Sequence, residues 1–146
     1  MKDIQIVQEL LENENLALAI VKDGNIVYKS TGRGIKPLYT AFLEMKDKLE
    51  GSSVADRVTG KAAAMLCVNA GIKELKTKLI SENAIGVLKE SNVTYSYDVS
   101  TPFIENRDRN GMCPVETLSL KVNDINELLR GIAEFLEKIE KANKWR

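Results

Sequence analysis

The chain has 146 residues, of which 44% are hydrophobic and 29% are charged, as in an ordinary globular protein. Its 21 lysines and arginines balance 21 acidic residues, and only 5% of the residues are aromatic. This composition argues against binding to nucleic acid or to a membrane surface. The length suits one domain with a sizeable core, and we expect a single domain over residues 1–146.

The chain contains no histidine and has two cysteines. These cysteines, Cys67 and Cys113, match no zinc motif and are too few for a disulfide framework, which fits a reducing compartment. No apolar run reaches the roughly 18 residues that cross a bilayer, and the first residues lack the regions of a signal peptide. We therefore expect a cytoplasmic protein with no metal and no other cofactor.

The N-terminal region predicts a helix followed by a β-hairpin. Apolar residues at helical spacing indicate a helix that ends near residue 13. The continuous apolar run at 16–21 is typical of a buried strand. Asp23-Gly24 then supplies a tight turn into a second strand at 25–29.

Two helices are predicted next. Pro37 fits the first turn of a helix that ends before Gly51. Ser53 and Asp56 resemble a capping box, so we expect a second helix to begin there. This helix would continue to Gly71, a residue suited to a left-handed cap.

The rest of the chain alternates between strands and helices. The predicted elements are a strand at 75–79, a helix capped by Ser81, a strand at 93–99, a polar loop at 100–111, a short helix opened by Pro114 and a long amphipathic helix capped by Asn123. A hairpin followed by alternating strands and helices predicts an α/β fold with a mixed sheet and helices on both faces.

This order of elements resembles the cytidine-deaminase-like fold. The chain is also similar to an uncharacterised prokaryotic family of that fold, known only as a domain of unknown function. The resemblance rests on Thr31-Gly32-Arg33-Gly34-Ile35 with Pro37-Leu38, Ala55-Asp56-Arg57 with Gly60-Lys61-Ala62-Ala63, Ser81-Glu82, Asn106-Arg107, Gly111, Cys113-Pro114 and Glu116. It implies a three-layer α-β-α sandwich and a homodimer or higher homo-oligomer.

The same resemblance implies that zinc chemistry is absent. In zinc-dependent members, one helix begins with His or Cys, any residue and Glu, and a second begins with Pro-Cys-x-x-Cys. These positions correspond to Gly60–Ala63 and Ser81–Ala84, which carry Gly-Lys-Ala-Ala and Ser-Glu-Asn-Ala. A catalytic zinc ion needs about three nitrogen or sulfur ligands, and these segments supply none.

In this fold the starts of the two helices face a common cleft. Helix N-termini present unpaired N–H groups and partial positive charge, which favours a small anionic or nucleotide-like ligand. The alternative from the residues alone is that Arg57 and Lys61 form a solvated helix face. The candidate ligand-binding residues are Arg33, Asp56, Arg57, Lys61, Ser81, Asn106 and Arg107.

Cys113, Glu116 and Glu82 are the candidate catalytic residues. A thiol at a helix start can ionise and act as a nucleophile, and a carboxylate in a dry cleft can act as a general base. The alternatives are a buried structural cysteine and acids that merely stabilise helix N-termini. The sequence thus leaves three hypotheses: a zinc-free ligand-binding module, a metal-independent enzyme and a non-catalytic regulatory or interaction protein.

Overall fold

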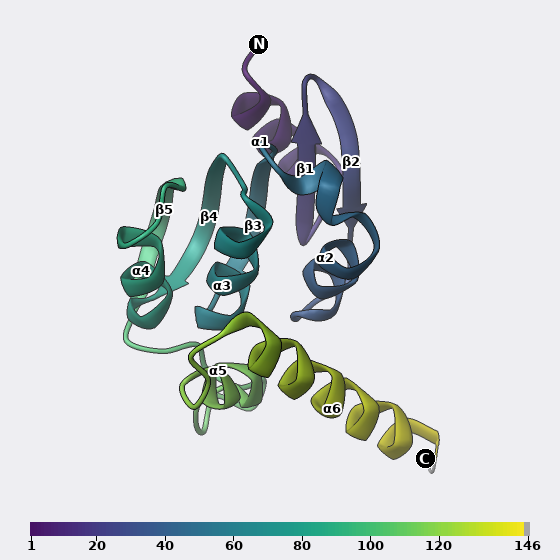
Figure 1. Cartoon of the computed structure of the whole chain (residues 1–146), viewed down its shortest axis with the longest axis vertical. Helices are drawn as coiled ribbons and strands as arrows, with labels where there is room; N and C mark the ends of the chain where they lie inside the picture. The colour runs from purple at the N-terminus through teal and green to yellow at the C-terminus, as the bar shows by residue number, and fades with distance from the viewer. Residues whose placement is uncertain (145–146) are drawn as a thin grey trace.

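The computed structural model describes residues 1–144, which form one five-stranded sheet and six helices (Figure 1). In chain order the elements are α1 (Asp3–Asn13), β1 (Leu18–Lys22), β2 (Asn25–Ser30), α2 (Lys36–Leu49), β3 (Ser53–Thr59), α3 (Lys61–Ala70), β4 (Glu74–Ser81), α4 (Glu82–Lys89), β5 (Thr94–Thr101), α5 (Pro114–Ser119) and α6 (Ile125–Lys144).

The sheet is mixed and has the strand order β2-β1-β3-β4-β5. Strand β1 pairs antiparallel with both β2 and β3, whereas β3, β4 and β5 are parallel. The turn between β1 and β2 places Asp23 and Gly24 in the left-handed region, with φ of 52° and 79°. Strands β3 and β4 are parallel, and each is followed directly by a helix. The N-termini of α3 and α4 therefore lie close together at the C-terminal ends of these two strands.

Helices cover both faces of the sheet, as predicted. The alternation of side chains along β1 separates the two layers. Ala19 and Val21 pack in a small cluster with Val7 and Leu11 of α1. The alternate residues of β1, Leu18 and Ile20, belong to the main core, which includes residues of α2, α3 and α4. Figure 1 shows α2, α3 and α4 on the side of the sheet that faces the viewer.

The two C-terminal helices lie beyond the C-terminal ends of β3 and β4. Helix α5 contacts α3, and α6 contacts α5, α3 and α2. Of the residues of α6, only Leu128 and Ile132 are fully buried. The C-terminal half of α6 runs away from the body of the protein (Figure 1).

The predicted helix start at Ser53 is wrong. Residues Ser53–Thr59 form β3, the middle strand of the sheet, and α3 begins only at Lys61 after a Gly60 cap. The three-residue spacing of Ser53 and Asp56 imitates a helix cap, but Asp56 makes its hydrogen bonds within the strand. Asp56, which suggested a capping box, accepts hydrogen bonds from the Arg57 N–H and the Thr59 hydroxyl. The Gly71 cap is confirmed, with φ of 74°.

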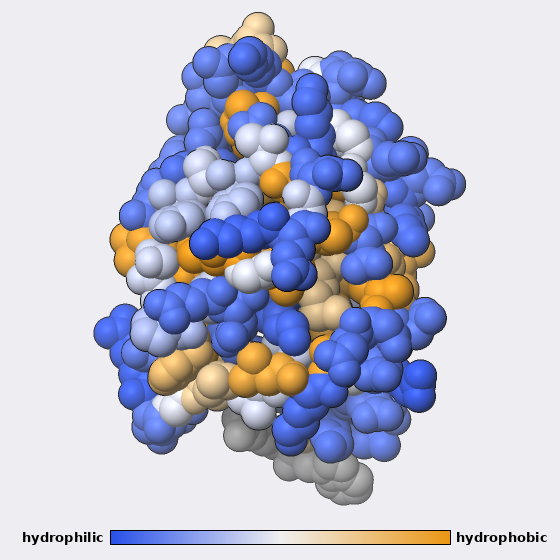
Figure 2. Space-filling model, turned by 60° about the vertical axis from the view of Figure 1, so that its left-hand side comes forward, coloured by the Kyte–Doolittle hydropathy of each residue, from blue (hydrophilic) through white to orange (hydrophobic). Residues whose placement is uncertain are grey.

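The other element predictions agree with the structure to within a few residues. Ser81 caps α4 as expected, because its Oγ accepts a hydrogen bond of 3.1 Å from the Ala84 N–H. Within residues 1–144, no helix is both long and apolar enough to cross a membrane. On the face that Figure 2 shows, hydrophobic surface is divided into patches by hydrophilic side chains.

Candidate functional site

The carboxylate of Glu116 lies buried where the N-termini of α3 and α4 meet. Glu116 is only 2% exposed. Its Oε1 accepts hydrogen bonds from the Lys61 N–H at 2.8 Å and from the Ser81 hydroxyl at 3.2 Å. Its Oε2 accepts a hydrogen bond of 2.7 Å from the Ile104 N–H in the loop after β5. One side chain of α5 thus joins two helix starts and a loop.

Gly60 allows this carboxylate to approach the start of α3. A Cβ atom at position 60 would lie 3.1 Å from Glu116 Oε1 and 3.3 Å from Ile104 Cγ1. Its backbone is extended, with φ of −94° and ψ of −175°, so that close packing and not an unusual conformation favours glycine here. A side chain at residue 60 would therefore crowd the hydrogen-bonded carboxylate.

Glu116 stabilises the end of α3 electrostatically as well as through hydrogen bonds. The first N–H groups of a helix have no partner within the helix, and the helix dipole adds positive charge there. A carboxylate at this place supplies what a bound anion would supply. The structure thus brings together three predicted site residues, Lys61, Ser81 and Glu116, with Lys61 contributing its main chain.

Asp56 belongs to a second polar group on β3 and β4. Its Oδ2 accepts a hydrogen bond of 3.0 Å from Thr59 Oγ1, which lies 2.8 Å from Thr77 Oγ1. Thr59 and Thr77 are fully buried. Burial raises the pKa of Asp56 to about 7, although hydrogen bonds from the Thr59 hydroxyl and the Arg57 and Val58 amides oppose the shift.

Hydroxyl geometry is consistent with a protonated Asp56. Each threonine hydroxyl has one hydrogen to donate. Thr59 therefore cannot donate to Asp56 and to Thr77 at once; a proton on Asp56 would reverse the Asp56–Thr59 hydrogen bond and free the Thr59 hydroxyl to donate to Thr77, while Thr77 donates to the Leu79 carbonyl oxygen, 3.3 Å away. Every member of this chain then has a partner. Thr59 and Thr77 were not predicted as site residues, because nothing in the local sequence pairs them across 18 positions.

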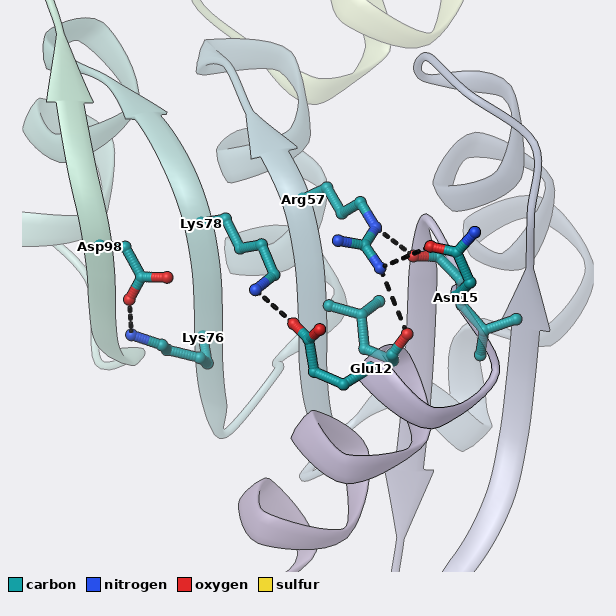
Figure 3. A network of polar contacts seen from close by, with 8 residues as sticks. Glu12, Asn15, Arg57, Lys76, Lys78 and Asp98 are labelled. Atoms are coloured by element: carbon teal, nitrogen blue, oxygen red, sulfur yellow. Dashed lines mark hydrogen bonds and ion pairs between the residues drawn. The ribbon is translucent and has the colours of Figure 1, made fainter.

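The guanidinium of Arg57 does not join Lys61. Arg57 Nε donates to the Leu16 carbonyl oxygen at 2.5 Å, and Nη2 donates to the Leu11 carbonyl oxygen at 3.4 Å and to Asn15 Oδ1 at 3.3 Å. Arg57 therefore ties the end of α1 to the sheet (Figure 3). Because residues 53–59 form a strand, Arg57 and Lys61 do not share a helix face.

The sheet beside Arg57 carries two ion pairs, which Figure 3 also shows. Lys78 pairs with Glu12 of α1, and Lys76 pairs with Asp98 of β5 at 2.6 Å. The two lysines lower the pKa of the carboxyl groups that they contact, Glu12 and Asp98. Exposed pairs of this kind contribute little to stability.

The remaining candidate residues are dispersed. Cys113 occupies the N-cap position of α5 without a side-chain hydrogen bond to the helix and is half-buried, and Glu82 is exposed at the start of α4. Arg33 is exposed in the loop between β2 and α2. Asn106 bonds to Asn110 within the loop after β5, and Arg107 of the same loop is exposed. Their roles in binding or catalysis stay predictions.

Two hollows of the surface lie away from Glu116. One hollow of about 170 Å³ lies on the α1 face between Glu12, Lys76 and Asp98, and one of about 250 Å³ lies beside the ends of α2 and α3. Sites for small molecules usually enclose at least about 300 Å³. Within residues 1–144, no three His, Cys, Asp or Glu side chains are placed to hold a metal ion.

These observations define an α/β protein with a five-stranded mixed sheet, in which a buried carboxylate joins two helix starts. The sequence model of the family described as "Domain of unknown function (DUF1893)", TM1506, matches residues 6–136. The chain therefore belongs to the DUF1893 family.

A solved structure supports this membership. The crystal structure of a DUF1893 family protein, TM1506 from Thermotoga maritima, is similar with a TM-score of 0.83 and 31% sequence identity. The similarity covers 92% of this chain and 90% of that chain. No curated protein matches the sequence.

Proposed function

We propose that this DUF1893 protein is a non-catalytic interaction or regulatory protein in which Glu116 fills the place of a ligand. The observation that carries the proposal is the set of three donors on the Glu116 carboxylate, from Lys61, Ser81 and Ile104. A general base must reach the proton that it removes. At 2% exposure, Glu116 presents almost no surface to a substrate.

We further propose that the fold is cytidine-deaminase-like. In support, the segments that correspond to the two zinc motifs, Gly60–Ala63 and Ser81–Ala84, both lie at helix starts. Both segments also contact the same carboxylate, since Lys61 and Ser81 each donate to Glu116 Oε1. In this proposal an internal carboxylate has replaced the occupant of the site.

Thermal unfolding of the wild-type protein with added ligands tests the proposal. A ligand at about 100 times its Kd adds about 2.7 kcal/mol to stability, which raises Tm by several degrees in a domain of this size. We expect no such rise with zinc, inorganic phosphate or nucleoside monophosphates. A rise in the wild-type Tm with any of these ligands would contradict the proposal; its loss in Lys61→Ala but not in Lys89→Ala would place the ligand beside the start of α3, because Lys89 lies at the far end of α4.

One observation favours binding of a small anion at the rim as a second candidate function. Arg107 and Arg109 are exposed in the loop after β5, and neither takes part in the ion pairs found within residues 1–144. Asn106 holds this loop through hydrogen bonds with Asn110. Two guanidinium groups on an ordered loop can bind a phosphate or carboxylate group.

Titration with a fluorescent nucleoside monophosphate separates the two functions. The rim hypothesis predicts saturable binding that weakens at least about tenfold in Arg107→Ala/Arg109→Ala, a loss of about 1.4 kcal/mol. The control is Lys48→Ala/Lys89→Ala, which removes the same charge from α2 and α4. Equal weakening in both variants would show non-specific attraction and would exclude the rim site.

A further inference from the structure

The loop after β5 contains an asparagine–glycine pair, Asn110 and Gly111. Of the asparagines in the chain, Asn110 is the one that a glycine follows. Glycine has no Cβ atom, so that its backbone nitrogen can approach the side chain of the preceding residue with little steric hindrance. Asn110 is exposed, and water therefore reaches its amide group. The pair thus has the groups that an attack of the Gly111 nitrogen on the Asn110 side chain requires.

Hydrogen bonds with Asn106 determine how the two asparagine amides are oriented. The Asn110 N–H donates to Asn106 Oδ1 at 3.1 Å, so that the other terminal group of Asn106 is its NH₂ group. That NH₂ group donates to Asn110 Oδ1 at 2.7 Å. A donor at a carbonyl oxygen stabilises the oxyanion that forms when a nucleophile attacks the carbon. Asn106 therefore activates the Cγ atom of Asn110 toward attack.

The nitrogen of Gly111 is available for this attack. Among the hydrogen bonds found within residues 1–144, the Gly111 carbonyl oxygen accepts from the Asn106 N–H at 2.9 Å, but the Gly111 N–H donates to no other group. The Asp23-Gly24 turn differs, because there the Gly24 N–H donates to Asp3 Oδ1 at 2.9 Å. Such a bond has to break before the nitrogen can react. The structure therefore distinguishes the two glycines.

We propose that Asn110 is a site of spontaneous deamidation. The Gly111 nitrogen loses its proton and bonds to Asn110 Cγ, and the Nδ2 group leaves with that proton as ammonia, which closes a five-membered cyclic imide. Water then opens the ring at either carbonyl group. Cleavage of the new C–N bond gives aspartate, whereas cleavage of the original peptide bond gives isoaspartate. The reaction needs no co-reactant other than water.

Both products change the loop that contacts Glu116. Each adds a negative charge to a loop that carries Arg107 and Arg109, both exposed. Isoaspartate also adds a methylene group to the main chain of the hairpin, in which the Cys113 N–H donates to the Ile104 carbonyl oxygen at 2.8 Å. The Ile104 N–H in turn donates to Glu116 Oε2. The reaction is therefore an irreversible change that reaches the contacts of the buried carboxylate.

Peptide mapping by mass spectrometry, on native protein kept in mildly alkaline buffer, tests the site. We expect conversion of amide to acid to be faster at Asn110 than at any other asparagine. Gly111→Ala should slow this conversion at least about tenfold, because the new Cβ atom hinders the attack. Alanine fits here, since its Cβ would meet Asn106 Nδ2 at an ordinary 3.6 Å and φ is not positive. Conversion at Asn110 no faster than elsewhere, or unchanged in Gly111→Ala, overturns the proposal.

The variant Asn106→Asp tests how the site is activated. It keeps an acceptor for the Asn110 N–H but removes the NH₂ donor to Asn110 Oδ1, so that deamidation should slow at least about threefold. An equal or faster rate would contradict the activating role of Asn106.

Hydrogen exchange tests the effect on the hairpin. The isoaspartyl form of the aged protein should exchange the Cys113 amide hydrogen faster than Asn110→Asp, in which the main chain keeps its normal length. Equal exchange in the two proteins would contradict the displacement of the hairpin.

Discussion

The Oε1 atom of Glu116 lies 2.8 Å from the backbone nitrogen of Lys61, so that a side chain of α5 caps the start of α3. The same oxygen accepts a hydrogen bond from Ser81, the residue that caps α4. The positive ends of two helices therefore converge on one internal negative charge. This arrangement stabilises the fold, because negative charge is favourable at the positive ends of helices.

Replacement of Glu116 by glutamine should destabilise the protein without changing its size. The amide retains one acceptor oxygen but turns an NH₂ group toward a main-chain donor, so that a buried N–H loses its partner. We expect a loss of about 1–3 kcal/mol in the free energy of unfolding, measured with urea. The matched control is Glu82→Gln at the exposed start of α4, which should cost less than about 1 kcal/mol. Equal losses in the two variants would contradict the role given to Glu116.

Two glycines make a paired test of the space around the carboxylate. In Gly60→Ala, the new methyl group would meet Glu116 Oε1 at 3.1 Å, and we expect a loss of about 1–3 kcal/mol. In Gly86→Ala on α4, the methyl group would meet nothing within 4 Å. There alanine should stabilise the helix by about 0.5–1 kcal/mol. Thermal unfolding of both variants checks this difference in sign, and two losses of similar size would contradict it.

The raised pKa of Asp56 predicts that stability falls as pH rises from about 4 to about 7. The folded state keeps the Asp56 proton up to a pKa of about 7, whereas the unfolded chain releases it near the ordinary aspartate pKa of 3.8. Between these values the folded state binds more protons, so that its stability declines with pH and then becomes level.

The variant Asp56→Asn isolates this contribution. The amide is neutral at every pH, so that the variant should lack this decline and should gain stability relative to the wild type at pH 7 and above. Asp98→Asn provides a contrast, because Lys76 lowers the pKa of Asp98. Its carboxylate contributes stability that is lost as pH falls below about 4. Parallel stability curves for wild type and Asp56→Asn, measured with urea at several pH values, would rule out the proposed protonation.

The two cysteines should differ in reactivity. Cys67 is 1% exposed in α3, and burial raises the pKa of its thiol far above the usual range. Cys113 is half-buried at the start of α5. Iodoacetamide should therefore label one thiol, Cys113, in the native protein and both thiols in urea, as mass spectrometry can show. Native labelling of Cys67 would indicate that α3 opens readily.

The sequence predicts most of the fold because local signals mark most of the elements. Asp23-Gly24, Pro37, Gly71 and Ser81 each mark a turn or a helix end that the structure contains. Strand β3 is not evident from the sequence, because it contains polar residues that are typical of turns and helix caps. In the structure, Asp56 and Thr59 of this strand form a hydrogen bond with each other. The spacing of Ser53 and Asp56 imitates a helix cap, and only the pairing with β1 and β4 reveals a strand.

The candidate site was predictable only in part. Glu116 was selected as an acid at a helix start, and Ser81 as a cap, but their contact spans 35 residues and follows from the packing of α5 on α3. The N–H of Ile104 leaves no signal in the sequence, since every residue except proline has such a donor. The predicted helix face with Arg57 and Lys61 depends on a helix from Ser53 onward, whereas residues 53–59 form β3.

The most direct measurement on Glu116 is chemical rescue of Glu116→Ala by formate. The truncation leaves the three donors from Lys61, Ser81 and Ile104 without their acceptor, beside a space that a small carboxylate can enter. We predict that formate raises the Tm of Glu116→Ala by several degrees over chloride at equal ionic strength, and leaves the Tm of the wild type unchanged. Equal effects of formate on both proteins, or a Glu116→Ala protein as stable as the wild type, would contradict the internal-anion role.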